Sequence, residues 1–145
     1  MQRARVYFAA SFAKCDPDVR RYFSSNDIIS YNNVISNVGN GLNSTTGTFK
    51  TPVSGVYQFT FTGRFTVVDS ENYIVVRKNG KNAYYFSTSV PDTKSTNDYT
   101  SLGVNWFMSH KKNDEIYIIV SNDGSKIDSY CKVPVFFSGV LMEEN

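Results

Sequence analysis

The chain has 145 residues, enough for a single domain that buries its own core. Charged residues make up 19% and aromatic residues 15%, a balance that favours an all-β domain. The net charge of +2 is close to neutral, which gives no indication of a nucleic-acid partner. No segment has the roughly 20 consecutive apolar residues that a membrane-spanning helix needs, so we expect no membrane insertion.

Alternating apolar residues bounded by turn residues predict about ten short strands. We expect them at Val6–Phe12, Ile28–Val34, Gly47–Lys50, Gly55–Val67, Tyr73–Lys78, Ala83–Ser89, Thr100–Ser109, Glu115–Ser121 and Val135–Met142. Residues 13–25 and 92–98 are predicted to be exposed loops. The pair Asn79-Gly80 favours a tight hairpin, because a type I′ turn needs positive φ at both central positions. Further turns are expected at 110–114 and 122–124.

The strand from Gly55 is expected to be central to the core. Its alternation places Tyr57, Phe59 and Phe61 on one face, and three aromatic rings in a row bury a large apolar area. Gly55 follows a proline-containing turn, where we expect a sharp bend that favours a residue without Cβ.

Three predicted strands are apolar on both faces. In the strand at Thr100–Ser109, Phe107 is on the other face from Leu102, Val104, Trp106 and Met108. In Glu115–Ser121, Tyr117 and Ile119 are on the other face from Ile116, Ile118 and Val120. In Val135–Met142, Phe136, Val140 and Met142 are on the other face from Val135, Phe137 and Leu141. A two-layer sandwich buries only one face of each sheet, so the second apolar face needs another cover. In a single domain of this size, a neighbouring subunit is the simplest cover.

One spacing pattern covers nearly the whole chain. The residues Asn37, Leu42, Phe49, Gly55, Tyr57, Phe59 and Phe61 stand at separations that resemble the signature of the complement C1q globular-head family, in the C1q/TNF-like superfamily. Tyr31 stands where that pattern has Phe, and Phe137–Leu141 looks like the family's closing strand. The resemblance implies a two-sheet jelly-roll sandwich that assembles as a homotrimer. Its structural core would include Phe49, Gly55, Tyr57, Phe59, Phe61, Phe137 and Gly139.

The resemblance also bears on domain boundaries. The segment Val6–Ala13 looks like the family's first strand, and Ser11 interrupts its apolar run, so we reject a secretory signal there. We therefore expect one C1q-like domain over residues 1–145, with the first strand beginning near residue 5. The chain has no Gly-X-Y repeat, so it encodes no collagen stalk.

Catalytic patterns are missing from the sequence, and we predict that the protein is not an enzyme. No phosphate-binding glycine loop, nucleophile elbow or carboxylate pair stands in a recognisable setting. The single histidine, His110, lies in a polar turn and is expected to be solvated. The pairs Arg20-Arg21 and Lys111-Lys112 are expected to be solvated loop charges. No cofactor is required by any motif.

Calcium is a possible ligand of the loop at residues 92–98. Members of the resembling family often bind Ca²⁺ near the trimer apex through acidic residues of this loop, which makes Asp92 and Asp98 candidates here. Ca²⁺ needs six or more oxygen ligands and Lys94 lies between the two carboxylates, so we favour ordinary turn residues over a metal site. As ligand-binding residues we nominate Asp92, Lys94, Asp98 and Tyr99 from this long polar loop.

Two covalent features are open. In the resembling fold, the first and last strands are antiparallel neighbours, which would bring Cys15 close to Cys131 and allow a disulfide; two free thiols are the alternative. Asn43-Ser44-Thr45 matches the N-glycosylation sequon, and a chance match is the alternative.

Three functions fit these features. We favour a secreted recognition module, a C1q-like trimeric head that binds microbial or glycan surfaces in innate-immune recognition. The alternatives are a receptor ligand or extracellular scaffold that binds a cell-surface protein, and a structural surface-coat trimer. The ligand itself is not specified, since loops rather than the fold determine it.

Overall fold

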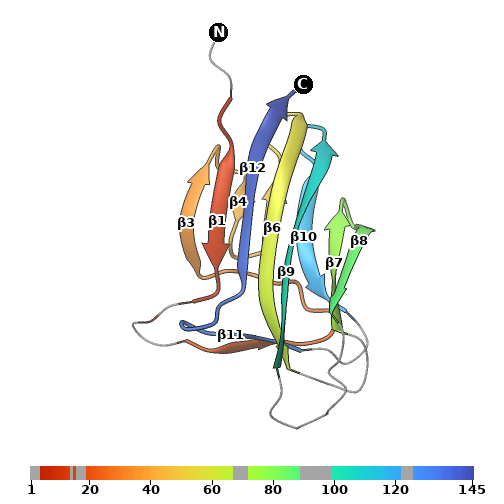
Figure 1. The fold of residues 1–145 in the computed structure, drawn as a ribbon. Coiled ribbons are helices and arrows are strands. Elements are labelled where there is room, and N and C mark those ends of the chain that lie inside the picture. The colour runs from red at the N-terminus through yellow and green to blue at the C-terminus, as the bar shows by residue number, and fades with distance from the viewer. Residues whose placement is uncertain (1–3, 14, 16–18, 67–71, 89–98, 122–125) are drawn as a thin grey trace.

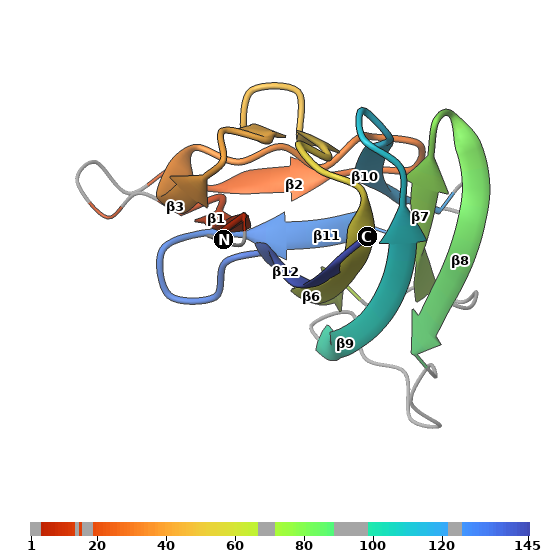
Figure 2. The same ribbon diagram turned by 90° about the horizontal axis from the view of Figure 1, so that it is seen from above.

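The computed structural model describes residues 4–13, 15, 19–66, 72–88, 99–121 and 126–145. These residues form two β-sheets packed face to face, a jelly-roll-like sandwich (Figures 1 and 2). No helix in this described part of the chain is long and apolar enough to span a lipid bilayer.

The larger sheet has seven strands: β1 (Tyr7–Ser11), β2 (Arg21–Phe23), β3 (Asn33–Val38), β6 (Gly55–Thr66), β9 (Tyr99–His110), β11 (Lys126–Ser129) and β12 (Phe136–Glu144). The smaller sheet has five: β4 (Leu42–Asn43), β5 (Thr48–Lys50), β7 (Asn72–Lys78), β8 (Lys81–Thr88) and β10 (Glu115–Val120). The order of the smaller sheet is β4-β5-β10-β7-β8, so β8 is an edge strand. The beginning of β1 and the end of β12 lie at the same end of the sandwich (Figure 1).

Strand β6 is the centre of the larger sheet. It pairs with β9 along its whole length, and on its other side with β12 and then with β11. Tyr57, Phe59 and Phe61 are fully buried, as the alternation predicted. The ring of Phe59 lies 5.5 Å from Trp106 and 5.9 Å from Phe137 between ring centroids, which places this strand against both neighbours in the core.

The glycines of the predicted core are required by close packing. A Cβ at Gly55 would collide with the carbonyl oxygen of Glu143 on the paired strand β12. A Cβ at Gly139 would come within 2.9 Å of the Phe59 ring. Gly55 is not among the residues with positive φ, so close approach to β12, rather than a sharp bend, requires glycine there. At the β7–β8 hairpin, φ is 53° at Asn79 and 79° at Gly80, which confirms the predicted turn.

The prediction missed three of the four shortest strands and misplaced β3, whereas the three-residue β5 lies within the predicted Gly47–Lys50. Residues 13–25 were expected to form a loop, but they contain β2, whose Phe23 is fully buried. The expected strand Ile28–Val34 is displaced: the strand is β3, and Ile28 makes only an isolated bridge to Ile119. Strands β4 and β11 were not predicted. The missed strands β2, β4 and β11 have two to four residues, too few to show alternation, and their tertiary partners define them.

The second faces of the apolar strands differ from one another. Ile119 of β10 is only 4% exposed, so this chain itself covers that face, and the expectation of an uncovered surface there is wrong. By contrast Phe107 of β9 is 58% exposed and Met142 of β12 is 53% exposed. Among the three strands predicted to be apolar on both faces, those with an uncovered second face therefore belong to the larger sheet.

Candidate functional site

A line of exposed apolar side chains crosses the outer face of the larger sheet. Phe107 of β9 is paired with Gln58 of β6, and Gln58 is paired on its other side with Val140 of β12. Val140 in turn lies opposite Tyr7, and Tyr7 opposite Val38. Phe107, Val140, Tyr7 and Val38 are all exposed, and we call these four residues the apolar band. It runs across five adjacent strands, β9, β6, β12, β1 and β3, with Gln58 of β6 between Phe107 and Val140. Residues that are directly paired share a face of the sheet.

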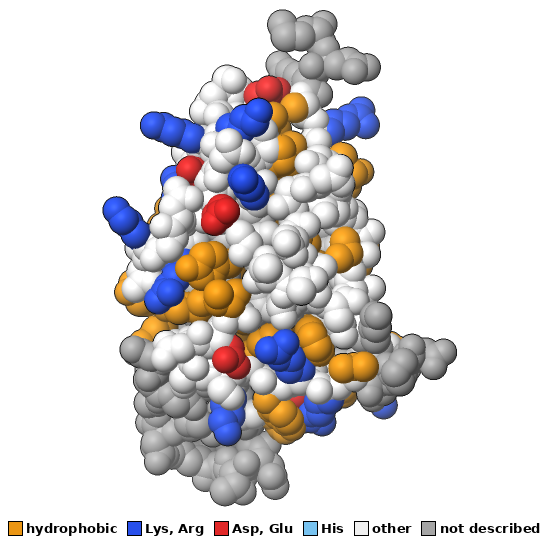
Figure 3. All heavy atoms as spheres, turned by 180° about the vertical axis from the view of Figure 1, so that it is seen from behind, with side chains coloured by type: hydrophobic (Ala, Val, Ile, Leu, Met, Phe, Trp, Pro, Cys, Tyr) orange, Lys and Arg blue, Asp and Glu red, His pale blue; other side chains and the backbone are white. Residues whose placement is uncertain are grey.

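A second exposed apolar feature lies at the β8 edge of the smaller sheet. Tyr84 and Tyr85 are both exposed but point to opposite faces of the strand, because successive side chains alternate. Phe86, on the same side as Tyr84, packs 5.2 Å from Trp106 in the core, whereas Tyr85 packs beside Tyr73 on the outer surface. Viewed from behind, the molecular surface is largely polar and charged, and the largest of its several groups of hydrophobic side chains lies on the side of β7 and β8 (Figure 3).

A group of arginine and tyrosine side chains surrounds one buried carboxylate on the larger sheet. Asp128 of β11 is paired with Arg64 of β6 on one side and with Tyr22 of β2 on the other. The side chain of Asp128 is fully buried. We call the following residues the arginine–tyrosine cluster: Arg20, Tyr22, Arg64, Tyr99, Asp128 and Tyr130.

The carboxylate of Asp128 is held by two guanidinium groups. Arg20 donates from Nε to Oδ1 at 3.0 Å and from Nη2 to Oδ2 at 2.9 Å, a bidentate pair. Arg64 donates from Nη2 to the same Oδ2. Desolvation by burial opposes the charge on Arg64, but its hydrogen bond to Asp128 and the carboxylate charge together raise its pKa above the ordinary value. A fully buried carboxylate requires such pairing, because an isolated buried charge is strongly destabilising.

Tyrosine rings lie over both guanidinium groups. The Tyr99 ring centroid is 4.0 Å from Arg64 Cζ, and the Tyr130 ring centroid is 4.7 Å from Arg20 Cζ. Tyr22 lies 5.1 Å from Arg20 Cζ. These distances are those of cation–π contacts. Tyr22 and Tyr99 each keep almost half of their surface exposed, at 48% and 45%. The cluster therefore presents cations and aromatic faces to solvent.

A disulfide lies next to this cluster. The structure joins Cys15 to Cys131, with a Cα–Cα distance of 5.2 Å. Strands β1 and β12 are antiparallel neighbours, the arrangement from which the pairing was inferred. Cys131 directly follows Tyr130, so the bridge ties the segment after β1 to the segment that carries one ring of the cluster.

Of the nominated ligand-binding residues, only Tyr99 falls within the described residues. It begins β9 and belongs to the arginine–tyrosine cluster. Asp92, Lys94 and Asp98, and with them the possible calcium site, lie outside the described residues. The described residues contain no group of three or more side chains that could hold a metal ion.

Sequence reasoning missed the rest of the cluster. Arg20 was expected to be a solvated charge, but it binds Asp128, which is 108 residues away in the chain. Arg21 was also expected to be solvated, and it is exposed, with its guanidinium 4.4 Å from the Phe23 ring centroid. Arg64 was one signal in the sequence that pointed to the cluster. It is a charged residue in an aromatic strand, on the other face from Phe61 and Phe65, with no acidic residue next to it in sequence.

The prediction that the His110 side chain is solvated is wrong. It was expected to be solvated, but its side chain is fully buried at the end of β9, with its ring 5.9 Å from Tyr57 and 5.7 Å from Phe59. Burial, then the positive charge of Lys78, lower its pKa to about 4. The position follows from tertiary packing: β9 pairs with β6 as far as His110 itself, opposite Gly55.

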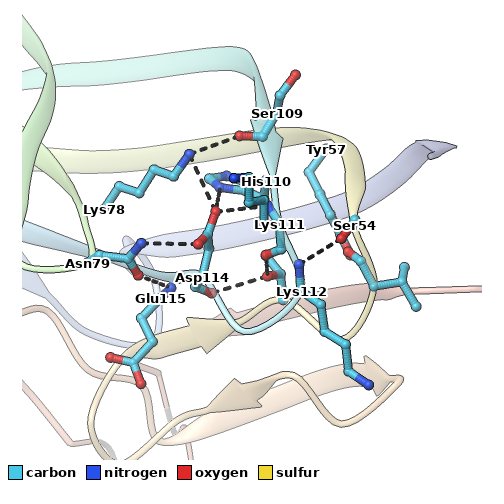
Figure 4. Close-up of polar contacts among 12 residues, drawn as sticks. Ser54, Tyr57, Lys78, Asn79, Ser109, His110, Lys111, Lys112, Asp114 and Glu115 are labelled. Atoms are coloured by element: carbon cyan, nitrogen blue, oxygen red, sulfur yellow. Dashed lines mark hydrogen bonds and ion pairs between the residues drawn. The ribbon is translucent and has the colours of Figure 1, made fainter.

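Asp114 joins the turns around His110 (Figure 4). It accepts hydrogen bonds from Asn79 Nδ2 at 3.0 Å and from the Lys111 amide at 2.9 Å, and lies 3.4 Å from Lys78 Nζ. Burial opposes its negative charge, but these hydrogen bonds and the lysine lower its pKa to about 2. The contacts join the β7–β8 turn to the β9–β10 turn, which is a structural role. Lys111 and Lys112 are exposed, as predicted.

Asn43 is the last residue of β4, in the β4–β5 hairpin expected for the sequon. Its side chain is exposed, and its Oδ1 accepts a hydrogen bond from the Thr46 amide at 3.3 Å. This hairpin belongs to the smaller sheet, away from the apolar band. The position leaves the site accessible to a glycan.

Comparisons with known proteins agree with this architecture. The model of the C1q domain family matches residues 12–142. Mouse complement C1q tumor necrosis factor-related protein 3 is 30% identical over 118 residues, which cover 81% of this chain and 44% of that protein. The chain thus spans less than half the length of this relative.

Solved structures show the same fold. The globular domain of a zebrafish complement 1qA protein aligns with a TM-score of 0.71 at 18% identity, covering 97% of this chain and 99% of that one. Eiger TNF from S. frugiperda aligns with a TM-score of 0.74 at 11% identity, covering 99% and 96%. Murine APRIL at pH 5.0 aligns with a TM-score of 0.71 at 14% identity, covering 95% and 99%.

These findings define the class first: a two-sheet, jelly-roll β-sandwich of the C1q/TNF type. Within that class, the family match extends over most of the chain. The chain belongs to the C1q domain family.

Proposed function

We propose that this chain is a non-enzymatic, extracellular recognition head that functions as a homotrimer. The apolar band is the main support for the trimer, because a monomer would leave Phe107, Val140, Tyr7 and Val38 exposed to water on one sheet face. The Cys15–Cys131 disulfide supports an extracellular setting, because such bridges persist in oxidising compartments.

A closed ring of three copies needs two different patches on each copy. The band supplies one patch, and Tyr84 at the β8 edge, close to β9, supplies the other. An obligate interface of this kind buries on the order of 2,000 Å² or more. Light scattering at micromolar concentration tests the assembly: we expect three times the chain mass, and a monomer mass would reject it.

Replacing either neighbouring tyrosine of β8 gives a matched pair of variants. Tyr84→Glu would place a charge in the proposed interface, and Tyr85→Glu would place the same charge on the opposite face of the strand. We expect the first variant to dissociate and the second to remain a trimer. Equal masses for both variants would contradict an interface at this edge.

For the ligand, we propose a saccharide of a microbial or cell surface. The arginine–tyrosine cluster supports this, because it presents exposed tyrosine rings beside guanidinium groups at the end of the sheet away from the apolar band. A glycan and microbial-polysaccharide array probed with the assembled protein is the test. Saturable binding to saccharides supports the proposal, and binding to none of them rejects it.

A further inference from the structure

We propose that the arginine–tyrosine cluster is a binding platform for acidic saccharides, in which the guanidinium groups bind a sugar carboxylate and the rings of Tyr22 and Tyr99 pack against sugar rings. This inference deepens the proposed function and rests on it. Nothing in the family match assigns a ligand to these residues.

The charge balance of the platform favours an anion. Arg20 and Arg64 outnumber the single buried carboxylate of Asp128, which they pair with. Exposed Lys126 lies two residues before Asp128 on β11, on the same face, because the residue between them is buried in the core. Asp128 is the one acidic residue in β2, β6, β9 and β11. Among the described residues of the cluster and these four strands, these three cations outnumber the one carboxylate and give a positive balance.

The guanidinium groups retain donors for a ligand. The side chain of Arg20 is 43% exposed, and a guanidinium has five N–H donors, of which Arg20 gives two to Asp128. Nε of Arg64 has no hydrogen-bond partner although the atom is buried. That atom is shut off from solvent, so the donors within reach of a ligand are the exposed ones, chiefly those of Arg20. The cluster already shows the matching acceptor, since a carboxylate accepts two parallel bonds from Arg20.

The tyrosines favour a sugar over a simple anion. Each ring contacts a guanidinium group, and each still keeps almost half of its surface exposed to solvent. Strand order places Tyr99 on β9 at one side of the cluster and Tyr22 on β2 at the other, with β6 and β11 between them. Three strand spacings give a width of roughly 14 Å. A tyrosine offers an apolar ring face and a hydroxyl, which suits a sugar ring with C–H faces and hydroxyl edges.

The platform is separate from the proposed subunit interface. The apolar band crosses β6 at Gln58, and the cluster crosses it at Arg64. Six residues of extended strand span about 20 Å. A trimer formed through the band therefore leaves room for a ligand at the other end of the same sheet face.

The test uses the full chain in its assembled state and isothermal titration with three probes. These are a short oligogalacturonate, a neutral galacto-oligosaccharide of equal length, and an oligo-aspartate peptide of equal charge. We expect the oligogalacturonate to bind, with an affinity that falls as salt rises, and the other two to bind at least ~10-fold more weakly, because neither offers both charge and sugar rings. Oligo-aspartate binding as tightly would overturn the saccharide assignment.

Variants locate the site. In Tyr22→Ala with Tyr99→Ala, we expect about a 10-fold or greater loss of oligogalacturonate affinity, because both ring contacts are removed. Tyr85→Ala removes an exposed tyrosine of the other sheet and should leave affinity unchanged. Arg20→Lys keeps the charge but loses the planar fork, and should also weaken binding. Light scattering and thermal melting check that each variant is assembled and folded.

The outcomes separate this inference from the proposed function. If the wild type binds saccharides and the double tyrosine variant binds them equally well, the recognition head stands and the platform assignment is overturned. If the trimer forms but binds oligogalacturonate no better than the neutral sugar, the acidic ligand class is overturned, while the array still tests other glycans. If no saccharide binds at all, both are rejected.

Discussion

The two ends of one sheet face differ in chemistry although they share the same strands. Near the termini, β9, β12, β1 and β3 present the apolar band, with β6 between β9 and β12. Toward the other end, β6 and β9 continue beside β11 and β2, and the outward side chains become Arg64, Asp128 and Tyr22. An apolar surface gains free energy when another protein surface covers it, whereas exposed arginine and tyrosine suit a soluble ligand. The comparison indicates that assembly and recognition occupy separate ends.

The disulfide lies at the end of the sheet that carries the arginine–tyrosine cluster. Among the changes considered, its removal should lower the free energy of unfolding the most. The Cys15–Cys131 bridge spans 116 residues of sequence, and closing so long a loop stabilises by about 4–5 kcal/mol in the chain-entropy model. Denaturant unfolding of Cys15→Ser with Cys131→Ser should show that loss. Reduced wild-type protein is the control and should behave alike. A variant as stable as oxidised wild type would mean that the bridge does not restrain the chain.

Strand β6 runs through the core between the two ends, and truncating one of its side chains should cause the next largest loss of stability. Phe59 is fully buried and contacts rings from both sheets, so Phe59→Ala should destabilise the fold by about 3–5 kcal/mol. Phe107→Ala on the outer face is the matched control, and should change chain stability far less at concentrations where the chain is monomeric. Equal losses in chemical denaturation would show that the apolar band is part of the core.

The termini end should lose stability in acid. His110 has a folded pKa of about 4 against 6.5 in the unfolded chain, so the unfolded state binds the proton first. Stability is therefore complete above pH 6.5 and falls as pH drops toward 4, by ~3 kcal/mol from this group. Asp114, with a pKa of about 2, adds a further loss below pH 3.8.

His110→Gln tests the assignment of that acid loss. It removes the titrating ring while keeping a polar side chain of similar length, so the loss between pH 6.5 and 4 should disappear. Unfolding curves at a series of pH values measure this. If His110→Gln shows the same pH dependence as wild type, another group is responsible for it.

Assembly is the next property to perturb. Val140→Lys places a charge in the middle of the apolar band, and we expect the trimer to dissociate while the chain stays folded, because Val140 is exposed in the single chain. Light scattering with circular dichroism measures both properties. Lys126→Glu at the cluster end is the control, and should leave the mass unchanged while weakening binding of an acidic sugar. A trimer that tolerates Val140→Lys would contradict assembly through the band.

The smallest effect concerns Asn43. Its exposed position on the β4–β5 hairpin predicts glycosylation in secreted eukaryotic material with little change in stability or mass of assembly, since it lies away from both ends of the larger sheet's face. Mass spectrometry of that material, with Asn43→Gln as the control, checks it. Only unmodified Asn43 would settle the matter in favour of a chance sequon.

Local patterns in the sequence determined most of this fold. The alternation in β6 identified the face of Tyr57, Phe59 and Phe61, and Asn79-Gly80 determined the β7–β8 turn, because both depend on residues adjacent in the chain. Short strands such as β2 and β11 could not be predicted, because they are defined by pairing with β6 and with each other.

Only the tertiary structure determined which charged side chains pair with one another and which are buried. Arg20, Arg64 and Asp128 are far apart in sequence, and each resembles an ordinary surface residue until the sheet brings them together. The same holds for His110, which lies in a polar turn by sequence but is buried by the pairing of β9 with β6. Burial and ion pairing depend on contacts across strands, and a single sequence records those contacts only through the fold.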